Sequence, residues 1–193
     1  MKRIAVFCGS GEGTESIYKE HAYTVGKTLA EQGIEVIYGG AKIGLMGAVA
    51  DGALQHGGIV RGVIPTFLRT KEVAHTTLTE LIVTETMHER KLKMHELSEG
   101  IITLPGGWGT MEELFEMLTW GQLGLHPKPI GLLNTNGYYD SLIALNETMI
   151  QKGFLKSTYS SMLITSASID GLLSQMRAYI APVRPVWMTE QTT

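Results

Sequence analysis

Residues 100–123 read Gly100-Ile101-Ile102-Thr103-Leu104-Pro105-Gly106-Gly107-Trp108-Gly109-Thr110-Met111-Glu112-Glu113-Leu114-Phe115-Glu116-Met117-Leu118-Thr119-Trp120-Gly121-Gln122-Leu123. The apolar run at the start predicts a buried strand, and residues 110–123 predict a helix. The glycines between them let a backbone approach a ligand without any Cβ in the way. The start of the helix presents unpaired N–H groups there, which favours an anion such as phosphate. With two glutamates in the first turn, this stretch predicts chemistry on a phosphorylated small molecule.

The same alternation of apolar runs and amphipathic stretches extends along the whole chain. Strands are expected at residues 4–8, 35–38, 59–64, 81–83, 101–104, 130–133 and 162–165, and helices at 15–32, 44–56, 87–98, 110–123, 138–152 and 169–180. Strands that are apolar throughout and separated by helices indicate a parallel sheet covered on both faces. We therefore predict an α/β fold with a doubly wound, mostly parallel Rossmann-like sheet, and ligands at the carboxyl ends of its strands.

The chain has a composition typical of one globular domain. It has 193 residues, of which 44% are hydrophobic and 18% charged, and we expect a single nucleotide-binding domain over residues 1–181 with a loosely ordered tail at 182–193. The net charge of -3 argues against nucleic acid or anionic membrane as a partner. No apolar run approaches the roughly 18 residues that a membrane span needs. The apolar part of the N-terminus is too short for an export signal and Cys8 is the only cysteine, so a cytoplasmic location is expected.

Two further glycine-rich turns follow the first and second predicted strands. The first, Gly9-Ser10-Gly11-Glu12-Gly13-Thr14, departs from the dinucleotide fingerprint because threonine stands at the sixth position. It is either a tight turn or a place where Ser10 and nearby amides line a nucleotide pocket without NAD. The second, residues 39–47, contains a G-x-x-x-x-G in which Leu45-Met46 replace the Lys-Ser/Thr of a P-loop. Hydrolysis of a nucleoside triphosphate is therefore not expected.

A basic helix is expected just before the strand that leads into the main motif. Residues 87–95 read Met87-His88-Glu89-Arg90-Lys91-Leu92-Lys93-Met94-His95. Such a charge run is usually a solvated face. However, this helix begins after the carboxyl end of a strand, which lets Arg90 point at the same pocket as the glycine turns. The planar guanidinium of arginine pairs with phosphate or carboxylate and keeps its charge at any working pH.

Arg90-Lys91 followed by Pro105-Gly106-Gly107-x-Gly109-Thr110-x-x-Glu113 resembles the LONELY GUY (LOG) family of nucleoside monophosphate phosphoribohydrolases. The likeness extends through Val6-Phe7-Cys8-Gly9-Ser10, Tyr38-Gly39-Gly40, Gly44-Leu45-Met46-Gly47, Trp120-Gly121-Gln122-Leu123-Gly124 and Lys128-Pro129-Ile130-Gly131-Leu132-Leu133-Asn134. The resemblance implies that Arg90 and Glu113 are the catalytic pair. It implies substrate-binding positions at Glu72, Lys91, Gly107, Trp108, Gly109, Thr110, Met111, Glu112 and Thr119. From their own places in the sequence, Ser10 and Gly106 in the glycine turns and Met87 at the start of the basic helix are also expected to bind the substrate. It also implies a purine nucleoside 5′-monophosphate as the ligand and a homodimer as the assembly.

The chemistry of this family explains why it would need a carboxylate beside the sugar. Cleavage of an N-glycosidic bond builds positive charge on the ribose ring, which a fixed carboxylate stabilises while it orients or deprotonates water. We assign this role to Glu113 from the resemblance, because spacing alone does not separate it from Glu112. A general AMP nucleosidase and a non-catalytic nucleotide or cofactor carrier remain as alternatives.

Other residues add two expectations. The six histidines show no spacing typical of zinc and have no cysteine partner, so neither a metal nor a cofactor is expected. Family members are also labelled lysine decarboxylases, but a pyridoxal phosphate enzyme needs a Schiff-base lysine, which has no evident setting here.

The helix at 110–123 is apolar on more than one face, which predicts that it is fully buried or packed against another subunit.

Overall fold

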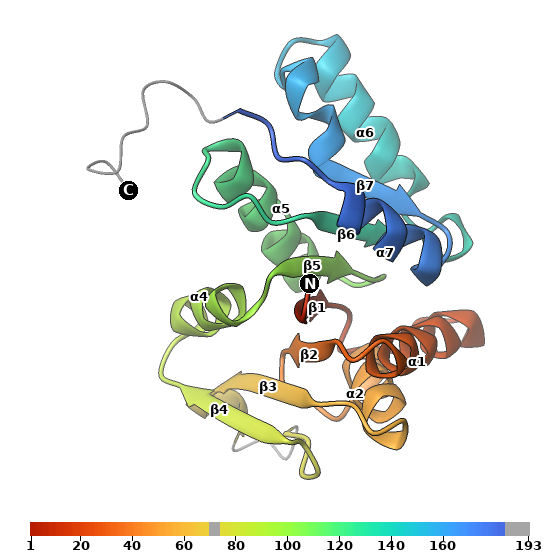
Figure 1. The fold of residues 1–193 in the computed structure, drawn as a ribbon, viewed down its shortest axis with the longest axis vertical. Helices are drawn as coiled ribbons and strands as arrows, with labels where there is room; N and C mark the ends of the chain where they lie inside the picture. The colour runs from red at the N-terminus through yellow and green to blue at the C-terminus, as the bar shows by residue number, and fades with distance from the viewer. Residues whose placement is uncertain (70–73, 184–193) are drawn as a thin grey trace.

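The structure, a computed structural model, describes residues 1–69 and 74–183. Within these residues one seven-stranded sheet has the order β4-β3-β2-β1-β5-β6-β7 (Figure 1). All pairs of neighbouring strands are parallel. The strands are β1 (Arg3–Phe7), β2 (Glu35–Tyr38), β3 (Val60–Pro65), β4 (Glu80–Thr84), β5 (Gly100–Thr103), β6 (Ile130–Leu133) and β7 (Leu163–Ser166).

Helices cover both faces of the sheet, because the central strands are apolar on both sides (Figure 1). One face carries α1 (Ser16–Glu31), α2 (Gly44–Gln55) and α7 (Ile169–Ala178). The other carries α4 (Met87–Leu97), α5 (Trp108–Gln122) and α6 (Asp140–Gln151). Shorter helices are α3 (Thr66–Arg69), η1 (Thr135–Gly137) and η2 (Ser157–Met162). The predicted fold class is therefore confirmed.

The strand order reverses between β1 and β5. These two strands are neighbours, with Phe7 paired to Thr103, although α1, β2, β3 and β4 come between them in the chain. The chain leaves β1 toward one face of the sheet and leaves β5 toward the other, which opens a crevice where ligands bind in folds of this kind. The Gly9 N–H donates to the Pro105 carbonyl over 3.0 Å and ties the two turns together.

Several element boundaries differ from the predicted ones. Helix α5 begins at Trp108, two residues before the predicted start, with Gly107 as its N-cap. Helix α6 begins at Asp140, two residues after the predicted start, because Tyr138 and Tyr139 form a turn between η1 and the helix. Helix α3 has four residues, too few to show a helical period in the sequence. Glu72 and most of the predicted tail at 182–193 lie outside the described residues. In the part of the chain that the structure describes, each helix is too short or too polar to cross a bilayer.

Candidate active site

A cavity of about 600 Å³ lies at the carboxyl edge of the sheet, where the strand order reverses. The ends of β1, β2 and β3 contribute to it, together with the first turns of α4 and α5. Its lining includes three groups from the sequence analysis: Ser10, Arg90 with Met87, and the stretch Gly107 to Thr110 with Glu112 and Glu113. The glycine turns and the basic helix therefore do meet at one place.

Arg90 is fixed at this place by its helix and by two hydrogen bonds. At the start of α4 the Thr86 hydroxyl accepts from the Glu89 N–H over 3.1 Å, and the Glu89 carboxylate accepts from the Glu85 N–H over 2.9 Å. This arrangement resembles a capping box and sets where the helix begins. The buried Arg90 side chain donates from Nε to the Val63 carbonyl over 3.0 Å. Its Nη1 donates to Glu113 Oε1 over 2.8 Å.

The glycine at the end of β2 makes room for this arginine. A Cβ on Gly39 would lie 2.2 Å from Nη2 of Arg90, which no real side chain allows. Glycine at position 39 thus allows the close approach of the guanidinium.

Glu113 is the buried partner of Arg90. Both side chains are 10% exposed, and both line the cavity. Burial raises the pKa of the Glu113 carboxyl above its ordinary value of 4.5, while the positive charge of Arg90 opposes that rise. The pair therefore places a carboxylate of raised basicity, held in one orientation, against the cavity.

Glu112 has a different partner and different surroundings. Its side chain is 56% exposed and forms an ion pair with Lys91, whose own side chain is only 7% exposed. The Lys91 ammonium also lies 3.1 Å from the Glu116 carboxylate, one turn further along α5. Lys91 thus joins α4 to α5 and lies outside the cavity lining, although the resemblance implied that it contacts the substrate.

The start of α5 has the features of an anion site. The N-cap Gly107 provides no side-chain cap for the first-turn N–H groups. A Cβ added to Gly107 or to Gly109 would meet no atom within 4 Å, and neither residue has a positive φ. Neither packing nor backbone conformation therefore requires glycine at these two positions. The open space beside them is available to a ligand.

The remaining predicted residues are spread over several surroundings. Trp108 is 94% exposed at the cavity. Gly106 lines an adjoining hollow of about 330 Å³ that shares Ser10 and Gly107 with the cavity. Met111 packs against the hydrophobic core. The exposed Thr119 donates to the Phe115 carbonyl over 2.7 Å and lines a separate groove between α5, α6 and η2.

The cavity also has an apolar wall, most of which the sequence pattern did not indicate. It consists of Phe7, Ile43, Met46, Ile64, Leu68 and Met94 together with Met87. Met87 was expected at the site, whereas the others have the sequence character of ordinary core residues. They come from five separate segments, so no local pattern in the sequence marks them as one surface.

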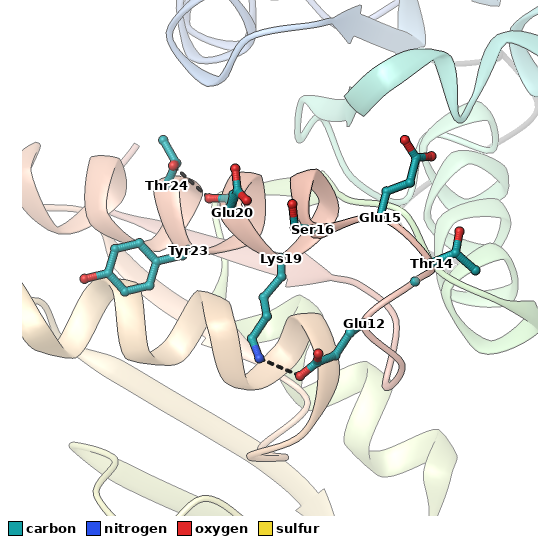
Figure 2. Close-up of a pocket in the computed structure, with 9 residues that line it drawn as sticks. Glu12, Thr14, Glu15, Ser16, Lys19, Glu20, Tyr23 and Thr24 are labelled. Atoms are coloured by element: carbon teal, nitrogen blue, oxygen red, sulfur yellow. Dashed lines mark hydrogen bonds and ion pairs between the residues drawn. The ribbon is translucent and has the colours of Figure 1, made fainter.

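A second hollow, of about 690 Å³, lies along the start of α1 (Figure 2). Its carboxylates are Glu12, Glu15 and Glu20, and its one ammonium, Lys19, is 2.6 Å from the Glu12 carboxylate. A surface with this excess of negative charge repels phosphate. The hollow is therefore a poorer anion site than the turn before α5.

No cluster of three or more His, Cys, Asp and Glu side chains suited to a metal ion occurs in residues 1–69 and 74–183. Cys8 lines the cavity but is buried, and burial raises the pKa of its thiol well above the usual range. The thiol is then uncharged at neutral pH and unsuited to act as a nucleophile.

Comparison with known proteins gives matches over nearly the whole chain. Residues 46–176 match a family model described as possible lysine decarboxylase. The chain is 44% identical over 177 residues to the probable cytokinin riboside 5′-monophosphate phosphoribohydrolase LOGL1 of Oryza sativa subsp. japonica. The matched residues make up 92% of this chain and 79% of that protein. It is 41% identical over 180 residues to the cytokinin riboside 5′-monophosphate phosphoribohydrolase LOG1 of Arabidopsis thaliana, covering 93% and 84%.

Solved structures of lower identity share the fold. The molybdenum cofactor binding protein of Rippkaea orientalis superposes with a TM-score of 0.70 at 21% identity, covering 92% of this chain and 97% of that one. The molybdenum cofactor carrier protein of Chlamydomonas reinhardtii gives a TM-score of 0.67 at 20% identity, covering 91% and 95%. At this identity the likeness concerns the arrangement of strands and helices alone.

Proposed function

Because the chain belongs to the LONELY GUY family of cytokinin riboside 5′-monophosphate phosphoribohydrolases, we propose that it hydrolyses the N-glycosidic bond of an adenosine 5′-monophosphate. Water adds to the anomeric carbon of the ribose, and the products are the free base and ribose 5-phosphate. The observation that carries this proposal is the buried Arg90–Glu113 pair, which lies in one cavity with an uncapped helix start.

Glu113 is the group that acts on the reacting sugar in this proposal. Positive charge develops on the ribose ring as the bond to the base lengthens, and the carboxylate stabilises that charge. The same carboxylate accepts a proton from the attacking water, a task for which a raised pKa suits it. Arg90 holds the carboxylate in place through the 2.8 Å hydrogen bond, while its own position is fixed by the Val63 carbonyl.

The start of α5 and the glycines before it bind the 5′-phosphate. Their N–H groups and the helix dipole favour a dianion. The buried Thr110 hydroxyl lines the same cavity. Phosphate binding at a distance from the cleaved bond supplies positioning energy, so a nucleoside without phosphate should be a poor substrate.

The apolar wall favours an N6-substituted base over plain AMP. A cavity bounded by several aliphatic and methionine side chains gains free energy when an apolar group displaces water, about 25 cal/mol per Å² of surface buried. An isopentenyl substituent has this character. Decarboxylation through pyridoxal phosphate is disfavoured, because no lysine appears among the described residues that line the cavity and Lys91 is engaged by two carboxylates.

The experiment is incubation of the purified protein with isopentenyl-AMP, AMP and the corresponding nucleosides, with chromatography for the released base. We expect fast release from isopentenyl-AMP, slower release from AMP and little from the nucleosides. Equal rates for the two monophosphates would indicate a general AMP nucleosidase. Tight binding of nucleotide without any released base would instead indicate a carrier and would refute the proposal.

We further propose that two copies of the chain form a homodimer through the groove between α5, α6 and η2. Phe115, Leu118, Met149 and Tyr159 line this groove, and Phe154 at its side is 87% exposed. Phe115 is also exposed, and Leu118, Met149 and Tyr159 are partly exposed. Apolar side chains gathered in this way are typical of a surface that another protein covers. Light scattering should then give a mass close to twice the 21.1 kDa of one chain.

A further inference from the structure

Three consecutive carbonyl groups in the turn between β5 and α5 are held by donors from outside the turn. The Leu104 carbonyl accepts from the Tyr139 hydroxyl over 2.6 Å, and the Gly106 carbonyl accepts from the Tyr138 hydroxyl over 2.7 Å. The Pro105 carbonyl between them accepts from the Gly9 N–H over 3.0 Å. Two adjacent tyrosines, more than 30 positions further along the chain, thus bind the turn that the proposed function assigns to the phosphate.

The bond from Tyr138 decides the direction of one N–H group. In a planar trans peptide the C=O and the N–H point in opposite directions, and the chain contains no cis peptide among its described residues. When the Gly106 carbonyl is held by Tyr138, the Gly107 N–H must therefore point away from that tyrosine. No group of the described residues accepts this N–H, and Gly107 lines the cavity.

A peptide between two glycines needs such a restraint. Glycine populates positive and negative φ about equally, so the Gly106–Gly107 peptide could rotate with little conformational cost. The rotated peptide would present a carbonyl oxygen where the N–H had been, and this oxygen would repel a phosphate. The hydroxyl of Tyr138 stabilises one of the two orientations.

Tyr138 is itself well held, although its side chain is 44% exposed. Its ring packs edge to face against Tyr139, with centroids 4.8 Å apart, and against Tyr18, with centroids 5.8 Å apart. Its N–H donates to the Thr135 carbonyl over 3.0 Å, and the N–H of Tyr139 donates to the Asn134 side chain over 2.7 Å. The direction of the Tyr138 hydroxyl is therefore fixed by packing before any ligand arrives.

We infer that Tyr138 is a positioning residue for phosphate binding, which keeps the Gly106–Gly107 peptide oriented with its N–H free for the ligand. This inference rests on the proposed function, because it takes the turn before α5 as the phosphate site. Nothing in the sequence pattern or in the resemblance assigns such a role to this tyrosine.

Tyr139 provides a matched control. It makes the same kind of hydroxyl-to-carbonyl bond, but the Leu104–Pro105 peptide has no N–H to orient. Tyr139→Phe leaves a buried carbonyl without its partner and should lower thermal stability, with little change in phosphate affinity. Tyr138→Phe should change thermal stability little, because the Tyr138 hydroxyl is closer to solvent. It should weaken phosphate binding instead.

The experiment measures binding and backbone orientation separately. Isothermal titration with ribose 5-phosphate should show affinity about tenfold weaker for Tyr138→Phe than for the wild-type chain, since one charge-assisted hydrogen bond is lost. In turnover assays, KM should rise with kcat nearly unchanged. In ligand-free samples labelled with ¹⁵N, the Gly107 amide resonance should move or split in Tyr138→Phe and stay in place in Tyr139→Phe.

The outcomes separate this inference from the proposed function. Weaker binding with an unchanged Gly107 resonance would mean that Tyr138 contacts phosphate directly, which would overturn the inference. Equal affinities in wild type and Tyr138→Phe would overturn it too, as would failure of the wild-type chain to bind ribose 5-phosphate. If the wild-type chain binds ribose 5-phosphate in the expected way but releases no base, the proposed function fails while the role of Tyr138 stands.

Discussion

Glu112 and Glu113 are adjacent in the chain, yet the fold gives them different partners. Glu113 pairs with Arg90 inside the cavity, whereas Glu112 pairs with Lys91 in a largely exposed position. The charges of this second pair act on Glu113 in opposite directions. Glu112 raises the pKa of the Glu113 carboxyl and Lys91 lowers it. We therefore expect Lys91 to act on Glu113 through its own positive charge, from outside the cavity lining.

This arrangement predicts how substitutions shift the pH dependence of turnover. The proposed mechanism requires the carboxylate form of Glu113, so kcat/KM should fall as the pH drops through a pKa above the ordinary 4.5. Lys91→Met should move this acid limb to higher pH, and Glu112→Gln should move it to lower pH. Profiles of kcat/KM against pH check both shifts. Movement of the limb in the same direction in both variants would contradict the electrostatic account.

Contacts of single residues in the site could be predicted from the sequence only in part. The convergence of Arg90 and Glu113 was expected from the resemblance, and the structure has them 2.8 Å apart. The sequence could not predict that Lys91 forms ion pairs with Glu112 and Glu116, because these pairs depend on how α4 packs against α5. Nor could it relate Tyr138 to Gly106, since a hydrogen bond across 32 positions leaves no local pattern.

Among the elements, α4 matters because its first turn carries Arg90. The hydrogen bonds of Thr86 and Glu89 fix where this helix begins. They therefore also help to position the Arg90 guanidinium against Glu113. The sequence contains the T-x-x-E spacing typical of such a helix start. The boundary of α5 was harder to predict, because glycine is a poor helix former and yet Gly109 lies within its first turn.

Removal of this cap should affect both stability and turnover. Thr86→Ala should lower the free energy of unfolding by about 1 kcal/mol and reduce kcat/KM several-fold, because the first turn of α4 frays. Ser168→Ala is the control: Ser168 caps α7 through the Gly171 N–H and does not line the cavity. It should cost similar stability without loss of kcat/KM, as measured by denaturant titration and initial rates. A similar loss of activity in both variants would point to a general effect of stability.

For the whole molecule, the strand order places the site. Apolar strands alternating with helices were enough to predict a doubly wound parallel sheet, because that pattern has few other solutions. The sequence did not reveal which two strands flank the reversal. That reversal brings the turn after β1 beside the turn after β5, and so joins Ser10 to the start of α5.

The proposed homodimer can be tested by a charge placed in the groove between α5, α6 and η2. Phe154→Asp introduces a charge at the α5–α6 groove and should convert the dimer to a monomer, since burial of an unpaired charge is costly. Ile180→Asp is the control, because Ile180 is comparably exposed but lies outside the groove. Light scattering at micromolar concentration distinguishes the two masses. A wild-type chain that is already monomeric would remove the proposal.

The central claim is that the Glu113 carboxylate, held by Arg90, catalyses hydrolysis of the bond between base and sugar. Its most direct test is the rate of base release from isopentenyl-AMP by Glu113→Gln, with Glu112→Gln as the neighbouring control and thermal melting to confirm folding. We predict a loss of about 100- to 1,000-fold for Glu113→Gln and a far smaller loss for Glu112→Gln. Release by folded Glu113→Gln at the wild-type rate would contradict the claim.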